Sequence, residues 1–367
     1  NQHSLNINQN TRSLQVVGFD AVVQPGFQYR FSEDLDQATT YTHHSNLSVL
    51  GMTYSFPNNK WVLTSNLGRL FTNLRADANG RPFRSETIDQ IYDPESIITN
   101  PVTIFEPGDS VVYVNAPSGF VNNGGITRTW HDHYVQEYTI KNTVKFFPDS
   151  KFHTLTFGQE HQETQYQWAD VSSPWVGAPI QINDTLTTPA ISIGTSSDIW
   201  AVNAADGGLF VEDNIVYKGI NASLGLRLNY WAYGKFVDDA IENPDALIID
   251  EVRTRYERRT VGILGRRFQA RLLPRINVSF PVTENNVLYF NYGHSMRLPH
   301  PRFVYAGLDP EFQDRGYLSR LGNPDLKPET TVSYEMGIKS QVTRKLGITF
   351  TAFNNDKYDY IVTRTIV

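Results

Sequence analysis

The sequence predicts an all-β fold, an antiparallel transmembrane β-barrel with short turns at one end and long loops at the other. Three observations lead to this fold class. Apolar and polar residues alternate with a period of two, the predicted strands come in pairs joined by short turns, and long segments separate the pairs. The composition agrees, because 13% of the residues are aromatic and only 19% are charged, yet the mean hydropathy is -0.38. Strands with one apolar and one polar face give this mixture.

The clearest alternation is in residues 220–232, INASLGLRLNYWA. Its apolar side chains share one face of a strand, and they include Leu224, Leu226 and Leu228. Arg227 and Asn229 fall on the opposite face. The same period recurs in three further segments, residues 138–146, 268–280 and 346–352. The first segment exceeds the usual soluble strand of about 5–6 residues and is long enough to cross a bilayer at a tilt.

Short polar turns join the strands into five hairpins, which gives about ten strands. The turns are centred near Pro57, Pro148, Lys218, Glu284 and Thr343. Four long segments separate the hairpins, namely residues 77–126, 169–205, 236–262 and 298–327. Outer-membrane barrels have short turns on the periplasmic side and long loops outside. A large soluble all-β protein with insertions on one face is the alternative.

Several other classes are disfavoured. Helical periodicity is almost absent, and no run of about 18 apolar residues predicts a membrane-spanning helix. The net charge is -6 and no basic stripe is present, so we expect no nucleic-acid partner. The chain has no cysteine, which excludes disulfides and thiolate metal sites. No nucleophile elbow, P-loop, HExxH or dinucleotide fingerprint occurs, and we expect no enzyme activity.

Two histidines and two acidic segments are candidate metal sites. His131 and His133 are two residues apart, so on a strand both face the same side, which suits a metal, although no third ligand is evident. The alternative is a polar strand end. Carboxylates that could hold calcium in an extracellular loop are Asp238, Asp239, Glu242, Asp245, Asp250, Glu251, Asp89, Asp93, Glu95, Glu106 and Asp109. A solvated acidic loop is the simpler interpretation.

Three arginines and an asparagine are candidates for the lumen of the barrel. Arg227, Asn229, Arg271 and Arg275 lie on the polar sides of their strands. Arginine suits carboxylates and sugar hydroxyls, so these side chains are positioned to contact a plug or a ligand. Simple lining of a water-filled lumen is the alternative.

The segment GNPDLKPETTVSYEMGIKSQ, residues 322–341, joins a proline-containing loop to an alternating strand. We expect Val332, Tyr334, Met336 and Ile338 to face lipid. The segment resembles the hallmark of TonB-dependent outer-membrane receptors, in which an NP-x-L-x-PE stretch leads into a Y-E-x-G strand. The matching residues are Asn323, Pro324, Leu326, Pro328, Glu329, Tyr334, Glu335 and Gly337. With three further motifs, this segment occurs in the order typical of the family, over roughly the last 160 residues. Within the family, the sequence most resembles the Oar-like and SusC-like receptors of Bacteroidota.

The resemblance implies a 22-stranded outer-membrane barrel whose lumen is blocked by a plug. Such a receptor imports a scarce ligand, a siderophore, oligosaccharide or peptide, with energy from TonB. We expect residues 1–367 to be an incomplete portion of the barrel domain, with the plug domain and the final strands outside this chain. The implied partners are outer-membrane lipid, TonB through that plug, and a surface lipoprotein or other envelope protein. The alternatives are a non-transport barrel that serves docking or adhesion, and a soluble carbohydrate-binding β protein.

Overall fold

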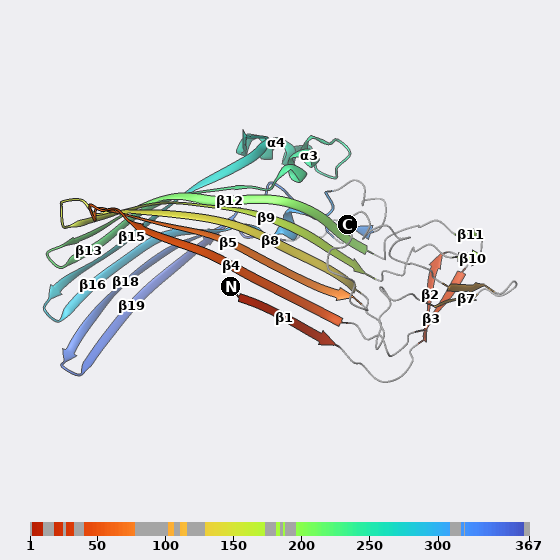
Figure 1. The fold of residues 1–367 in the computed structure, drawn as a ribbon, viewed down its shortest axis with the longest axis horizontal. Helices are drawn as coiled ribbons and strands as arrows, with labels where there is room; N and C mark the ends of the chain where they lie inside the picture. Colours follow the sequence, from red (N-terminus) through yellow and green to blue (C-terminus); the bar gives the residue numbers. More distant parts are fainter. Residues whose placement is uncertain are drawn as a thin grey trace.

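The computed structural model describes residues 2–9, 18–24, 27–32, 40–77, 102–105, 111–115, 129–172, 181–183, 186–187, 196–308, 317–318 and 320–362. One large antiparallel sheet dominates these residues (Figure 1). In spatial order its strands are β1 (Gln2–Gln9), β4 (Thr40–Ser55), β5 (Trp61–Asp77), β8 (Thr129–Phe146), β9 (His153–Ser172), β12 (Ser196–Tyr217), β13 (Ile220–Ala232), β15 (Arg266–Thr283), β16 (Asn286–Arg297), β18 (Glu329–Thr343) and β19 (Leu346–Tyr358). Two short strands extend it, β14 (Val261–Ile263) beside β15 and β17 (Tyr317–Leu318) beside β12.

Two small sheets lie beyond the long sheet at one end, on the right in Figure 1. One contains β2 (Gly18–Gln24), β3 (Phe27–Ser32), β7 (Val111–Asn115) and β6 (Val102–Phe105). The other pairs β10 (Gln181–Asn183) with β11 (Leu186–Thr187). Of these strands, β6, β7, β10 and β11 come from segments predicted to be long loops, whereas residues 18–32 had no assignment.

All five predicted hairpins are confirmed, and β1 adds a strand beside β4 that the pattern had not predicted. Their turns lie together at one end of the long sheet, on the left in Figure 1. The two-residue turn between β12 and β13 has Lys218 and Gly219, with φ values of 47° and 86°. Positive φ at both central residues gives the turn the twist that a two-residue hairpin needs. The opposite end of the sheet carries the long connections.

The strands extend further into the predicted loops than the alternation indicated. Residues 169–205 were predicted to be a long connection, but β9 continues to Ser172 and β12 begins at Ser196. β12 has 22 residues and β9 has 20. A membrane-spanning strand needs only about 9–11 residues. The central strands therefore continue well past the length of a bilayer span.

The long sheet has one apolar and one polar face, as predicted. Leu226 is 42% exposed and pairs with Val211 on one side and Pro274 on the other. Met336, which is 61% exposed, belongs to the same face. Large apolar side chains on this face therefore stay exposed in the described part of the chain. Val332 was also predicted to face lipid, but it is only 8% exposed.

The long connections contain helices, which corrects the expectation of an almost helix-free chain. The helices are α3 (Lys235–Glu242), α4 (Asp250–Arg259) and α5 (Pro301–Tyr305). In α3, Val237, Ala240 and Ile241 form a buried stripe at helical spacing. Acidic residues begin α4 and arginines end it, which complements the helix dipole. None of the described helices has the length and apolar character needed to cross a membrane.

The hydrophobic core lies where these helices meet the ends of β9, β12 and β13. It is built from aromatic and aliphatic side chains, Trp200, Val202, Trp231, Tyr233, Val237, Ala240, Ile241, Ala246, Tyr256, Val304, Tyr305 and Leu308. In this core the rings of Trp200 and Tyr305 are tilted relative to each other, with their centroids 5.1 Å apart. The core therefore fixes the long-connection end of the sheet and the loops above it as one packed unit.

Candidate functional site

The residues of the family-like segment link the folded loops to the sheet. Pro324 and Pro328 are fully buried. The Asn323 amide donates to the Phe303 carbonyl at 2.8 Å, so the segment is hydrogen-bonded to α5. The Tyr233 hydroxyl donates to the Leu326 carbonyl at 3.3 Å. The segment thus joins α5, the end of β13 and the start of β18, which begins at Glu329.

Asp325 connects the same segment to α4. Its buried carboxylate accepts from Arg255 Nε at 2.6 Å and from Arg259 Nη1 at 2.7 Å. The two arginines are four residues apart, so they project from the same side of the helix. Because a buried carboxylate is costly without partners, these two cations explain why an aspartate is accommodated there.

The strand half of the segment has a packing role. Gly337 faces the Tyr289 ring, and a Cβ built on it would lie 2.5 Å from the Phe350 carbonyl oxygen. Only glycine fits this position without a shift of backbone. Tyr334 lies on the apolar face, 5.2 Å from the Tyr292 ring, and Glu335 lies on the other face.

His131 and His133 meet a third potential ligand, Asp170 of β9. Asp170 Oδ1 lies 2.5 Å from His131 Nδ1 and 2.6 Å from His133 Nε2. His131 and Asp170 are directly paired across β8 and β9, which explains the contact. Among the described residues, these three form a group whose potential ligand atoms lie within 4.8 Å of one another.

Neighbouring side chains orient this cluster. The Trp168 indole donates to Asp170 Oδ2 at 3.0 Å, and its ring stacks on His133 at a centroid distance of 3.5 Å. Arg302, which follows the first residue of α5, lies 3.5 Å from Asp170 Oδ2 and 2.7 Å from the buried Asp198. The cluster is therefore partly enclosed at the long-connection end of the polar face, beside the aromatic core.

Asp170, Trp168 and Arg302 were not predicted as site residues. The hairpin turn gave only an approximate signal for the first two. In an antiparallel pair the numbers of facing residues have a constant sum, so the predicted turn centre near Pro148 places about residue 165 opposite His131, whereas the observed partner is Asp170. No comparable signal exists for Arg302, because α5 reaches the cluster through tertiary packing.

The four predicted lumen residues lie on the polar face. Arg227 Nη2 lies 3.3 Å from Glu160 Oε2, and its Nε donates to Asn229. Arg271 donates to Thr330 and lies 3.6 Å from Asp359 Oδ2. Arg275 makes no ion pair among the described residues. Its neighbours across the sheet are Gly225 of β13 and Gly293 of β16. Contact with a plug or a ligand stays a prediction for all four.

The acidic residues of the third long connection have several different environments. Asp238 is buried and accepts from the Tyr256 hydroxyl at 2.9 Å and from the Arg267 amide at 3.1 Å. Burial raises the pKa of Asp238, although both hydrogen bonds act in the opposite direction. Exposed Glu251 pairs with Arg255 at 2.5 Å. The calcium expectation stays a prediction, and Asp89, Asp93, Glu95, Glu106 and Asp109 lie outside the described residues.

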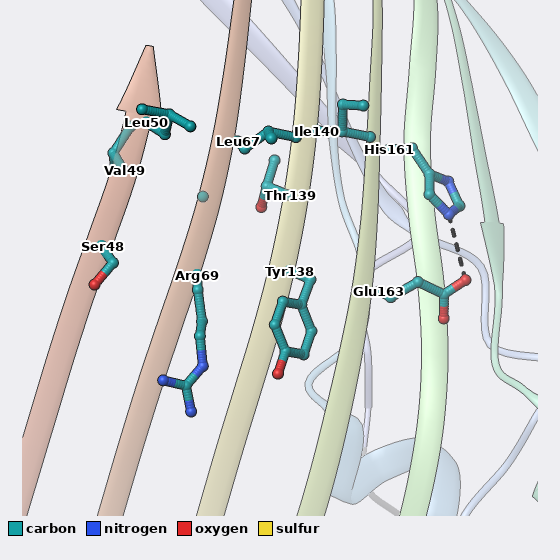
Figure 2. Close-up of a pocket in the computed structure, with 11 residues that line it drawn as sticks. Ser48, Val49, Leu50, Leu67, Arg69, Tyr138, Thr139, Ile140, His161 and Glu163 are labelled. Carbon is teal, nitrogen blue, oxygen red and sulfur yellow. Dashed lines mark hydrogen bonds and ion pairs between the residues drawn. The ribbon is translucent and has the colours of Figure 1, made fainter.

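Each face of the sheet carries a cavity. A groove of about 640 Å³ crosses β4, β5, β8 and β9 on the apolar face, with Leu50, Leu67 and Ile140 at one end (Figure 2). Tyr138 and Glu163 lie at its other end, where a polar band begins. A smaller cavity of about 270 Å³ lies on the polar side, between the end of β13 and α5.

The chain was compared with solved structures and with curated proteins. The structure of the copper transporter OprC has 13% identity and a TM-score of 0.49, over 89% of this chain and 40% of that one. A mutant of the ferric enterobactin receptor PfeA from Pseudomonas aeruginosa has 16% identity and a TM-score of 0.48, and the match covers 87% of this chain and 35% of the receptor chain. The pyoverdine receptor FpvA from Pseudomonas aeruginosa PAO1 has 10% identity and a TM-score of 0.47, and the match covers 88% of this chain and 37% of the receptor chain. No curated protein matches.

The chain thus spans well under half the length of these solved receptors. A family model described as TonB dependent receptor-like, beta-barrel, matches residues 2–367. The match covers the hairpins, both faces of the long sheet and the segment that contains Asn323 and Gly337. On this evidence the chain belongs to the TonB dependent receptor-like β-barrel family.

Proposed function

We propose that this chain forms part of the barrel wall of a TonB-dependent outer-membrane receptor that imports a scarce ligand. The observation that carries the proposal is the family match over residues 2–367, which coincides with a sheet that has two chemically different faces. The ligand classes we expect are siderophores, oligosaccharides and peptides. The resemblance to Oar-like and SusC-like receptors leads us to propose a Bacteroidota-type receptor.

The two faces of the sheet have separate tasks in this proposal. The apolar face, with Leu226 and Met336, meets the acyl chains of the outer membrane. The polar face, with Arg227 and Asn229, lines the lumen and meets water, a plug or the ligand. The short turns then lie in the periplasm, and the long connections lie outside the cell.

The proposal also requires additional strands. Within the described residues the sheet has two edge strands, β1 and β19. Unpaired backbone groups are not tolerated in the hydrocarbon of a membrane, so the edges need partners. We propose closure into a barrel of 22 strands around a plug, because barrels of that size are plugged. TonB would act on that plug, and a surface lipoprotein is a further proposed partner.

The folded loops are the proposed outer vestibule for the ligand. The core around Trp200 and Tyr305 holds α3, α4 and α5 over the polar face. The 270 Å³ cavity opens among Asp206, Arg297 and His300, which offer both charge signs beside aromatic rings. A site on such a packed scaffold is held more precisely than one on isolated loops.

The test combines location with energy dependence. The native protein should fractionate with the outer membrane, and deletion of its gene should abolish growth on one member of a panel of iron chelates, glycans and peptides. Deletion of TonB should give the same growth defect, because import depends on that energy source. A protein found only in the soluble fraction would refute the proposal. Normal uptake of the dependent nutrient in the absence of TonB would refute it as well.

A further inference from the structure

We infer that His131, His133 and Asp170 form a binding site for one divalent transition-metal ion of the Zn²⁺ type. Three ligand atoms from two adjacent strands converge within 4.8 Å at the long-connection end of the polar face. Both histidines project from the same side of β8, and β9 supplies the carboxylate opposite them. The site adds to the proposed import function and does not depend on it.

The donor set fits this class of metal. Two imidazoles and one carboxylate, with a fourth position open, are a known ligand set for Zn²⁺. Neighbouring ligand atoms around a tetrahedral Zn²⁺ are about 3.3 Å apart, given metal–ligand bonds of about 2.0–2.1 Å. The present distances from Asp170 Oδ1, 2.5 and 2.6 Å, are shorter. Entry of an ion therefore requires each imidazole nitrogen to move about 0.7–0.8 Å away from Asp170 Oδ1.

The surroundings hold each ligand in a suitable orientation. Trp168 and Arg302 contact Asp170 Oδ2, which leaves Oδ1 directed at the two imidazoles. Stacking on Trp168 fixes the plane of the His133 ring. Side chains that orient the ligands in this way are typical of metal sites, and their loss lowers metal affinity about 10–100-fold.

The local charge also favours a cation. Asp170 and Asp198 contribute two negative charges, and Arg302 contributes one positive charge. The cluster therefore keeps one negative charge when both histidines are neutral, which is the form that binds a metal. The competing interpretation is a hydrogen-bonded trio in which both imidazoles donate to Asp170 and no ion binds.

Isothermal titration calorimetry, in which Zn²⁺ is added to the purified protein in detergent, separates the two interpretations. We expect one Zn²⁺ per chain in the wild type. His131→Gln, His133→Gln and Asp170→Asn should each lower the affinity by at least about tenfold, since loss of a ligand costs no less than loss of an orienting group. His153→Gln is the matched control, because His153 contacts the carboxylate of Asp213 at 2.8 Å without a second histidine. Its affinity should equal that of the wild type.

Two further measurements keep the test valid if a ligand variant fails to fold. Trp168→Phe retains a stacking ring but loses the indole donor, so its Zn²⁺ affinity should fall about tenfold. Co²⁺ added to the wild type should give the intense visible absorption of a four-coordinate site. A folded wild type that binds no Zn²⁺ would overturn the inference. So would equal affinities in the wild type and all ligand variants. Neither result bears on import, which the uptake assay tests separately.

Discussion

Replacing Tyr256 with Phe tests whether the loops form a folded unit around a buried carboxylate. Tyr256 is fully buried in α4, and its hydroxyl donates to Asp238 of α3 at 2.9 Å. The substitution leaves one oxygen of Asp238 without its donor, while the Arg267 amide still holds the other. A hydrogen bond to an ionised group contributes about 1.5–3 kcal/mol, and a neutral one about 0.5–1.5 kcal/mol. The cost therefore depends on the protonation state of Asp238.

The sign of the pH dependence follows from the raised pKa of Asp238. Because burial raises this pKa above the ordinary value of 3.8, the carboxyl favours the folded loops most below that value. That contribution is lost as the pH rises through the raised pKa, where the carboxyl must ionise inside the protein. The Tyr256 hydroxyl opposes this loss by stabilising the ionised form. Tyr256→Phe should therefore cost about 1.5–3 kcal/mol near pH 8 and less near pH 4, approaching about 0.5–1.5 kcal/mol as the carboxyl is protonated.

Hydrogen exchange of the α3 and α4 amides, corrected for intrinsic rates at each pH, measures this local free energy of unfolding. Tyr305→Phe is the matched control, since the Tyr305 hydroxyl donates to the neutral Tyr233 carbonyl at 3.1 Å in the same core. Its cost should be about 0.5–1.5 kcal/mol at both pH values. An equal pH dependence in the two variants would refute the role assigned to Asp238.

Three further predictions concern the loops and the two faces. Asp325→Ala should expose α4 to protease, because it removes the carboxylate that binds two arginines, whereas Glu251→Ala should leave the cleavage rate unchanged. Leu226→Arg should destabilise the protein in liposomes by about 2–4 kcal/mol, measured by urea unfolding, and Asn229→Arg should cost much less. Gly337→Ala should cost about 1–3 kcal/mol in the same assay, because the new Cβ meets the Phe350 carbonyl.

Controls and contradicting outcomes differ among these predictions. For Gly337→Ala the matched control is Gly262→Ala, where a new Cβ has no heavy atom within 4 Å. A similar loss in both would show that the cost is not steric. Equal cleavage of the Asp325 and Glu251 variants would contradict the anchoring of α4. Equal losses at Leu226 and Asn229 would contradict the assignment of the two faces.

The alternating strands and their turns were predictable because each depends on local chemistry. The period of two in residues 220–232 placed Leu226 and Asn229 on opposite faces, and the structure agrees. Turn positions then determined which strands pair. The predicted turn near Pro148 identified β8 and β9 as partners but not their register, so the contact between His131 and Asp170 did not follow from it.

The loops were less predictable because their structure depends on tertiary packing. The buried stripe of α3 has only three residues, too few to distinguish a helix from a polar connection in the sequence. Asp238 looked like one of several solvated carboxylates, yet it is buried beneath Tyr256. Val332 alternates correctly with its neighbours, yet it is buried. Such outcomes need the folded core, and no local pattern contains it.

The central claim is that the apolar face of the long sheet contacts lipid and the polar face contacts water. This chain has no cysteine, so single-cysteine variants can carry one spin label each on an otherwise unchanged chain. We would label Leu226→Cys and Asn229→Cys in the protein reconstituted into liposomes, and measure relaxation by oxygen and by a water-soluble nickel chelate. The account predicts that oxygen relaxes the label at position 226 and that the chelate relaxes the label at position 229. Chelate access at both positions would contradict it.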